Sequence, residues 1–261
     1  PEGRISSSEE YRVRRNFHVE TYYQVAEGKR PQRFSVKDRD GDTLLELQHI
    51  PQGEIYRVNM GSTPRRREQG FRIDSLSGEW QPPDDNGHQS KQRGNLITGV
   101  HPYVRSTSDI LLVAPSAQED ANEVWMYTLG TVLHRAIQIH YELEEDELGL
   151  SFIGQQEHSK ILLYDPSDVG AGVWERLLSS QEDLQAVARL ALEICHYDPD
   201  TGDEKPEWVE RCALACYDCL LSYGNQQYHH LLDRREVRQT LLALAGSTVE
   251  PVGAVSREEQ Y

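Results

Sequence analysis

The four cysteines of this chain lie close together in the sequence and are its main candidates for binding chemistry. They are Cys195, Cys212, Cys216 and Cys219, spaced C-x16-C-x3-C-x2-C, and the chain has no others. Zn²⁺ prefers four tetrahedral ligands, and two cysteines separated by two residues are a common source of two thiolates. The pattern therefore predicts a zinc site made by these four cysteines, with His196 as a neighbour of the site rather than a ligand.

Two alternatives explain the same cysteines without a metal. They could form two disulfides, or they could be four unrelated thiols in a core. Disulfides are disfavoured because no secretory leader is visible and the rest of the chain contains no cysteine. We also expect a helix over residues 206–222, with Pro206 as its first residue, which would place Cys212 and Cys216 on one helix face.

A second group of residues suggests phosphodiester chemistry. His158, Lys160 and Asp165 form H-x-K-x4-D, a spacing that resembles phospholipase-D-type phosphodiesterases. The chain lacks the G-S-x-x-N element that usually follows, and it has one copy where such enzymes need two. We therefore predict that these residues are structural, with Asp165 ending a buried strand and accepting hydrogen bonds from the backbone around residues 170–172. A phospholipase-D-like nuclease remains the alternative.

Charge is distributed unevenly along the chain. Residues 1–115 hold 17 basic and 16 acidic residues, a net charge of +1, whereas residues 116–261 hold 10 and 27, a net charge of −17. A phosphate backbone would be repelled by the second half. If the chain contacts nucleic acid, we therefore expect the first half to do so. The candidate residues for phosphate contacts are Arg65, Arg66, Arg67, Arg12 and Arg14.

The patterns of apolar residues predict an α+β fold. Alternating residues and turn signals indicate strands in the first half, with Pro51-Gln52-Gly53 as one of the turns between them. Expected strands are 11–25, 33–37, 43–49, 54–59, 70–74, 107–114, 148–153 and 160–164. Expected helices are 117–141, 173–178, 182–195, 206–222 and 234–245. The prediction is a β-rich, antiparallel N-terminal half packed on an α/β C-terminal half that carries a four-cysteine zinc site.

Three regions are expected along the chain: a β-rich region at 1–115, a zinc-binding domain at 116–246 and a polar tail at 247–261. The chain begins with proline, so we expect it to be part of a longer polypeptide. No stretch approaches the ~18 apolar residues of a membrane span, so we expect no membrane partner and a cytoplasmic location. No G-x-x-x-x-G-K-[ST] loop occurs, so we do not expect this chain alone to be an enzyme.

Several of these segments together resemble a known domain. Residues 161–165 followed by Gly170-Ala-Gly172, then Cys195, then residues 212–226 and 232–234, are similar to the MZB-type domain. That domain occurs at the C-terminus of DEAD/DEAH-like superfamily 2 helicases in DNA repair. It also occurs in helicase partners of DISARM-type phage-defence systems. The similarity covers roughly residues 120–240 and is weaker over residues 33–80.

The resemblance implies a zinc-bearing accessory domain of a helicase-type DNA-processing or antiviral protein. It implies a helicase motor, in the same polypeptide or as a partner, and DNA contact through the complex. DNA repair and phage defence are the two cellular settings that the resemblance implies. A second alternative is a protein-interaction module without nucleic-acid contact, which would bind protein but show no salt-sensitive DNA binding.

Overall fold

The computed structural model describes residues 18–61, 70–81, 95–116, 122–154, 159–166 and 172–253. The chain divides into two compact units: unit 1 comprises Pro1–Tyr22 and Ile55–Arg105, and unit 2 comprises Tyr23–Glu54 and Ser106–Tyr261. Two long strands, β3 (Thr43–Gly61) and β7 (Tyr103–Pro115), contribute residues to both units. The units are therefore discontinuous in sequence, and the predicted boundary at residue 115 stays a prediction.

Unit 1 contains a small antiparallel sheet. Its strand order is β5-β4-β6, formed by β5 (Trp80–Gln81), β4 (Phe71–Asp74) and β6 (Leu96–Val100). The rings of Phe71 and Trp80 pack edge to face, with their centroids 5.5 Å apart. The strand predicted at residues 70–74 is therefore present and forms the centre of this sheet.

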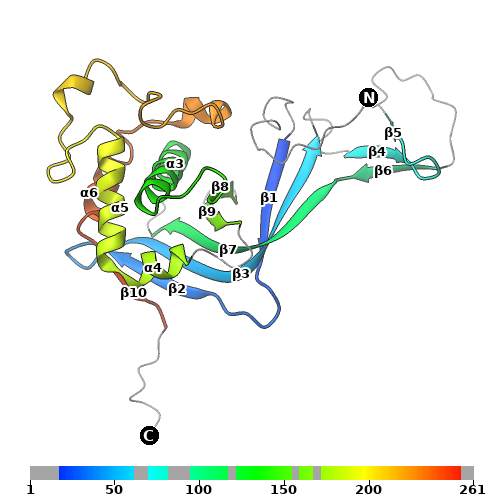
Figure 1. Ribbon diagram of the computed structural model, residues 1–261, viewed down its shortest axis with the longest axis horizontal. Helices are drawn as coiled ribbons and strands as arrows, with labels where there is room; N and C mark the ends of the chain where they lie inside the picture. The colour runs from blue at the N-terminus through cyan, green and yellow to red at the C-terminus, as the bar shows by residue number, and fades with distance from the viewer. Residues whose placement is uncertain are drawn as a thin grey trace, which may run out of the picture. The chain divides into compact units, whose positions relative to one another are not determined.

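The larger sheet has seven strands in the order β10-β2-β3-β7-β9-β8, with β1 also paired to β3 (Figure 1). The pairs β10–β2, β2–β3, β7–β9 and β8–β9 are antiparallel. Together with the helices described below, these strands confirm the predicted mixed fold with antiparallel sheets. The remaining strands are β1 (His18–Gln24), β2 (Gln32–Lys37), β8 (Gly149–Ile153), β9 (Lys160–Asp165) and β10 (Thr248–Pro251).

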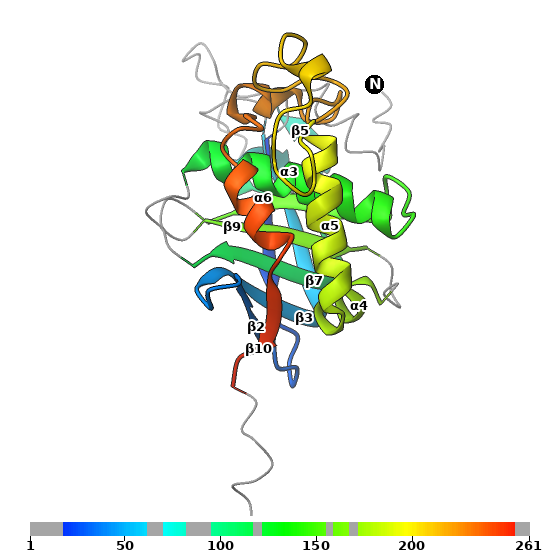
Figure 2. The ribbon, with the colours of Figure 1, turned by 90° about the vertical axis from the view of Figure 1, so that its left-hand side faces the viewer.

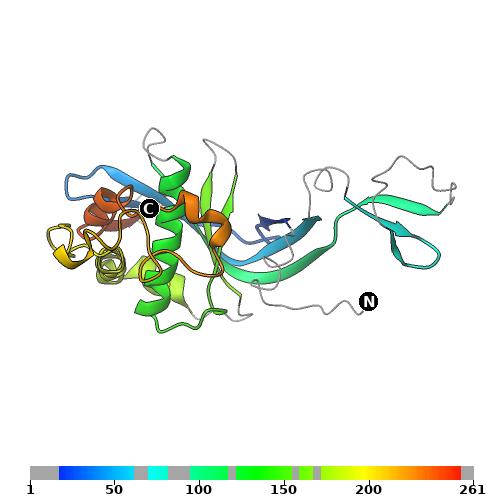
Figure 3. The same cartoon turned by 90° about the horizontal axis from the view of Figure 1, so that it is seen from above.

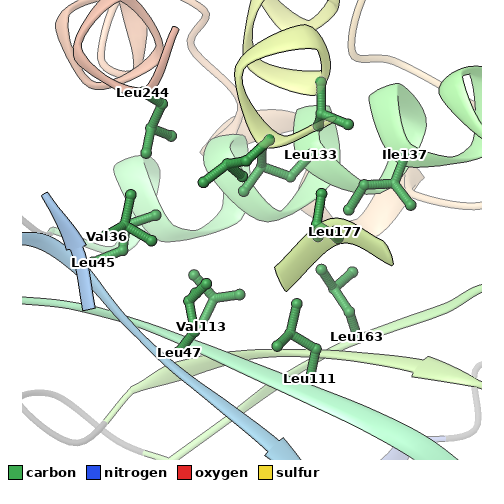
Figure 4. A pocket seen from close by; sticks show the side chains of 12 residues that line it. Val36, Leu45, Leu47, Leu111, Val113, Leu133, Ile137, Leu163, Leu177 and Leu244 are labelled. Carbon is green, nitrogen blue, oxygen red and sulfur yellow. The ribbon is translucent and has the colours of Figure 1, made fainter. Parts of the chain in front are cut away.

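Helices cover one face of the larger sheet in unit 2, as Figure 2 shows. They are α3 (Glu123–His140), α4 (Val173–Ser179), α5 (Gln181–Ile194) and α6 (Arg238–Leu244). Aliphatic side chains from β2, β3, β7 and β9 meet those of the helices in an apolar core (Figure 4). Examples from the strands are Leu47, Leu111 and Leu163, which face Leu133 of α3 and Leu177 of α4.

The first of these helices forms where the sequence pattern predicts it. The Asn122 side chain caps α3 by accepting a hydrogen bond of 2.9 Å from the backbone N–H of Trp125. Trp125, Leu129, Val132 and Ala136 are buried, as their helical spacing predicts. No helix in the described parts of the chain is both long and apolar enough to cross a membrane.

The turn expected at Pro51-Gln52-Gly53 is wrong, because β3 runs through these residues without a break. Gln52 adopts a positive φ of 54°, which bends the strand locally instead of ending it. Gly53 allows the close approach of Ile110, because an added Cβ would lie 2.5 Å from its Cδ1 atom and displace that side chain. The expected turn was thus a distortion inside one strand of 19 residues.

The helix expected over residues 206–222 is also wrong. Only Pro206–Trp208 forms a short 3-10 helix, η2, and turns follow it up to a second 3-10 helix, η3 (Gln226–Leu231). The region expected to be a polar tail instead begins with strand β10, whose Thr248 pairs with Lys37 of β2. Both differences depend on contacts between residues that are far apart in the sequence. The spacing of apolar residues along the chain does not reveal such contacts.

Candidate metal centre

Four possible metal ligands meet in unit 2, at the end of α5 and in the segment that follows it. They are His196, Cys212, Cys216 and Cys219, and their ligand atoms all lie within 4.8 Å of one another. This segment, drawn in yellow to orange in Figures 1 and 3, lies on the far side of the helices from the sheet in Figure 1. The structure thus brings together three of the four predicted cysteines and adds the histidine.

The separations between these atoms suit a zinc ion. The sulfurs of Cys212 and Cys219 are 3.6 Å apart, and Nε2 of His196 is 3.2 Å from the sulfur of Cys216. Tetrahedral zinc, with Zn–S near 2.3 Å and Zn–N near 2.0 Å, places two sulfurs about 3.8 Å apart and a sulfur and a nitrogen about 3.5 Å apart. Three thiolates and one imidazole are also a donor set that zinc prefers over harder cations.

The backbone at the end of α5 directs His196 toward the cysteines. Tyr197 N–H donates to the carbonyl of Leu192 at 2.9 Å, and His196 N–H donates to that of Glu193 at 3.0 Å. These two bonds form a Schellman motif, in which the residue at the His196 position is usually glycine because it is left-handed. His196 has a φ of 65°, an uncommon conformation for a residue with a side chain. Such local strain is typical of residues that are held for a function.

Trp208 holds the imidazole ring in place. The two rings are stacked, with centroids 3.7 Å apart and planes inclined by 3°. Trp208 is the last residue of η2, and its carbonyl accepts the N–H of Cys212 at 2.9 Å. The short 3-10 turn therefore orients one ligand through its side chain and another through its backbone.

The C-x2-C pair forms a tight turn around one sulfur. The backbone N–H of Cys216 donates to the sulfur of Cys219 at 3.0 Å, and the N–H of Cys219 donates to the carbonyl of Cys216 at 3.1 Å. A backbone N–H directed at sulfur favours the thiolate form, which is the form that binds a metal. The expected helix is therefore replaced by a turn that brings both cysteines to one point.

Cys195 lies beside this group but outside the set of four ligand atoms. It is the C-cap residue of α5 and is fully buried. Burial raises the pKa of its thiol to about 12, although the positive charge of Arg234 acts in the opposite direction. The four-cysteine set stays a prediction, and the geometry offers His196 in the fourth position.

Two arginines bind the backbone of the cysteine segments. Arg234 is 1% exposed, and its Nε and Nη2 donate to the carbonyl of Cys212 at 3.0 and 2.8 Å. Its Nη1 donates to the carbonyl of Cys195 at 3.2 Å, and Nη2 also pairs with Glu204 at 2.7 Å. Arg135 of α3 donates to the carbonyl of Cys219. These contacts fix the ligand segments relative to α3 and α5.

Burial sets the protonation of these groups in the absence of metal. It raises the pKa of the Cys212 thiol, with a further contribution from the hydrogen bond with Cys216, and it raises the pKa of Cys219 strongly. Burial and the nearby Arg234 charge lower the pKa of His196, which keeps the imidazole neutral. A neutral imidazole can donate a lone pair, whereas the thiols must lose protons as the metal binds.

Sequence reasoning missed the roles of His196, Trp208 and Arg234. Arg234 belongs to the segment on which the family resemblance rests, although the resemblance implies no role for it. A histidine that directly follows a helix-ending cysteine, where glycine is the usual residue, is the signal that could have identified His196.

The structure describes only some of the other residues that the sequence offers as candidates. Arg65, Arg66, Arg67, Arg12 and Arg14 lie outside the described residues, as does His158. Lys160 and Asp165 begin and end β9, which pairs regularly with β7 and β8. Residues five apart in a regular strand point to opposite sides of the sheet. This placement does not favour a joint catalytic role, and Asp165 does end a buried strand, at 3% exposure.

Comparison with known families identifies this segment. Residues 129–220 match the MZB family. The matching family model is described as the MrfA Zn-binding domain, and the matched residues include all four cysteines and His196. The match confirms the resemblance inferred from the sequence, and with the donor set it confirms zinc as the predicted cofactor.

A solved structure is also similar to the chain. The crystal structure of the DUF1998 helicase MrfA bound to DNA superposes with a TM-score of 0.47 at 12% identity. The superposition covers 87% of this chain and 25% of that one, so this chain spans about a quarter of the solved protein. A search of curated proteins found no match.

Proposed function

We propose that this chain is a zinc-stabilised accessory domain of a helicase-type protein, with zinc held by His196, Cys212, Cys216 and Cys219. The observation that carries this proposal is the set of four ligand atoms within 4.8 Å inside the segment that matches the MrfA Zn-binding domain. Four protein ligands fill all the tetrahedral positions, which is typical of a structural rather than a catalytic zinc. The metal therefore serves to hold a segment of chain in one conformation.

The segment that zinc would hold connects three elements of unit 2. His196 follows α5, the cysteines lie on turns between residues 212 and 219, and Arg234 precedes α6. Arg135 adds a contact from α3. A structural zinc at this point would fix the surface of the domain, and we propose that this surface supports assembly with a superfamily 2 helicase motor. The motor is either in the same polypeptide or in a partner.

DNA engagement through the complex is the second part of the proposal. The net charge of −17 on residues 116–261 disfavours contact between the zinc-binding half and phosphate. We therefore assign any direct DNA contact of this chain to Arg65, Arg66 and Arg67, with Arg12 and Arg14. The cellular settings that fit are DNA repair and phage defence in the cytoplasm.

Salt dependence tests the DNA contact directly. Replacing Arg65, Arg66 and Arg67 with alanine should flatten the plot of log K against log[salt] for duplex DNA by up to about 3, since each phosphate contact contributes about 0.9. The matched control replaces three exposed arginines of the acidic half, Arg189, Arg211 and Arg235, and should leave the slope unchanged. An unchanged slope in the first variant would show that the arginines are only solvated and favour a protein-interaction module.

The dependence on a motor requires a separate experiment. ATP hydrolysis by the helicase encoded with this chain should depend on DNA and on the zinc-loaded chain together. A chain carrying Cys216→Ser and Cys219→Ser should bind less zinc and fail to support that activity. Equal hydrolysis with and without the chain would contradict the proposal, and DNA cleavage by the chain alone that is lost with His158→Ala would support the nuclease alternative.

A further inference from the structure

A second group of metal-ligating side chains lies in unit 2, outside the cysteine segment. His49 of β3, Asp109 of β7 and Glu175 of α4 place their ligand atoms within 4.8 Å of one another. Nε2 of His49 is 3.3 Å from Oδ1 of Asp109 and 4.0 Å from Oε1 of Glu175. These three residues come from three elements that are distant in sequence, so the fold itself assembles the group.

The arrangement of the sheet explains how these residues meet. His49 follows Leu45 and Leu47 at alternate positions of β3, and Asp109 precedes Leu111 in the same way on β7. The histidine and the aspartate therefore lie on the face of the sheet that the helices cover. They occupy positions where the alternation would otherwise continue the apolar core.

Neighbouring contacts fix both the aspartate and the helix that carries the glutamate. The indole N–H of Trp174 donates to the carbonyl of Asp109 at 2.9 Å, which ties the first turn of α4 to β7. The backbone N–H of Gln52, at the bend in β3, donates to Oδ1 of Asp109 at 3.3 Å. The positive φ of Gln52 is thus part of the structure that surrounds this group.

Nε2 of His49 and Oδ1 of Asp109 are in hydrogen-bond contact at 3.3 Å, and the same separation also suits shared coordination of one ion. A hydrogen bond between a charged nitrogen and a carboxylate is usually about 2.7–2.9 Å long, shorter than the 3.3 Å between His49 and Asp109. Two ligands of a tetrahedral metal ion, each about 2.0–2.2 Å from it, lie about 3.3–3.6 Å apart. The 3.3 Å between His49 and Asp109 falls in that range. A small movement of the exposed Glu175 would bring its Oε1 to a similar distance from His49.

Two further features describe the surroundings of the group. His49 is 2% exposed, so the fold holds its imidazole in place with Nε2 directed toward the two carboxylates. Asp165 lies directly opposite Asp109 in the β7–β9 register, so its carboxylate is on the same face of the sheet. Asp165 therefore adds a carboxylate to the side of the sheet on which the group lies.

The geometry points to a second metal site, formed by His49, Asp109 and Glu175, that binds a divalent transition-metal ion. One imidazole and two carboxylates suit Mn²⁺, Co²⁺, Fe²⁺ or Zn²⁺ rather than the softer ions that thiolates select. Glu175 is 59% exposed, so an ion reaches the site from solvent. Three protein ligands leave coordination positions open to water, in contrast to the cysteine site with four ligands.

The test uses the full chain with its cysteine site already loaded with zinc. Mn²⁺ and Co²⁺ are titrated separately, with bound Mn²⁺ measured by loss of the free-ion EPR signal and bound Co²⁺ by its visible absorption. Each ion should bind at one equivalent without release of zinc. For Co²⁺, thiolate-to-metal charge transfer should be absent, because that band would report exchange into the cysteine site.

Glu175→Gln is the principal variant, because this exposed side chain can lose its charge without affecting the fold. It should weaken binding of both ions at least about tenfold, and His49→Gln should abolish it. Glu182→Gln is the matched control, since Glu182 is an exposed acid in the first turn of α5 and should leave affinity unchanged. The proposal is overturned if neither ion binds, or if binding is the same in the Glu175 variant and the control.

Discussion

The fourth ligand of the zinc site is the point at which sequence and structure make different predictions. The geometry assigns this position to His196, whereas the spacing of cysteines assigns it to Cys195. We therefore compare His196→Asn with Cys195→Ala. Asparagine tolerates the left-handed backbone of residue 196 and removes the imidazole, so the helix end is preserved. Alanine at residue 195 removes a buried thiol without introducing a new polar group.

The size of the expected effect follows from the energy of zinc binding. Structural zinc sites bind with about 10–16 kcal/mol of free energy near neutral pH, so one of four ligands accounts for about 3 kcal/mol. Loss of that ligand should weaken zinc binding by about 100-fold or more. His196→Asn should also remove the stacking with Trp208, which contributes about 1 kcal/mol to stability with or without zinc. Cys195→Ala should change zinc affinity only a few-fold.

Competition with a chromophoric chelator measures these affinities, and native mass spectrometry gives the number of zinc ions in each variant. His230→Asn is the control, because His230 is an exposed histidine that lies outside the ligand group. Circular dichroism of each variant shows whether the fold is retained. If Cys195→Ala loses zinc and His196→Asn keeps it, the geometric assignment is wrong and the four-cysteine site predicted from the sequence is correct.

Three further predictions concern stability in unit 2. Arg234→Met should lower the free energy of unfolding of the zinc-loaded chain by about 3 kcal/mol in chemical denaturation, because two buried cysteine carbonyls lose their donors. Chelation of zinc should increase amide hydrogen exchange first over residues 195–235. An increase in exchange in β9 before an increase over residues 195–235 would contradict this prediction. Burial tends to raise the pKa of Asp183, but hydrogen bonds from Tyr141 and Ser180 outweigh it and lower that pKa. The stability that this lowered pKa provides is fully present above the ordinary pKa of an aspartate, and it is lost as the pH falls through the lowered pKa of Asp183. Asp183→Asn should therefore reduce the melting temperature more at pH 7 than at pH 3.

Elements with strong local patterns could be predicted from the sequence. The helix capped by Asn122 and the strand that ends at Asp165 both form close to where apolar spacing placed them. The break at Pro51-Gln52-Gly53 could not be predicted, because those residues also suit a turn. Only the pairing of β3 with its neighbours, and the contact of Gly53 with Ile110, makes a bent strand the preferred structure.

The candidate metal centre was predictable in part for a similar reason. The close spacing of Cys212, Cys216 and Cys219 limits how far apart their sulfurs can lie, so their joint role follows from sequence. The contribution of His196 depends on a left-handed residue at the end of α5, which sequence alone does not reveal. The second group, at His49 and Asp109, depends on which strands are neighbours in the sheet, and no local pattern contains that information.

The composition of the cysteine segment explains why a metal would stabilise its fold, whereas the sheet and helices of unit 2 are stabilised by an apolar core. Strands and helices bury one continuous apolar core, which stabilises them by the hydrophobic effect. Between η2 and η3 the chain forms mainly turns, and Leu214, Tyr217 and Tyr223 are 46%, 64% and 46% exposed. Hydrophobic burial of these side chains is incomplete, so it offsets less of the entropy of ordering the chain. We propose that zinc and the buried guanidinium of Arg234 supply that order instead, and that the aromatic side chains left exposed lie on the surface used for assembly with the motor.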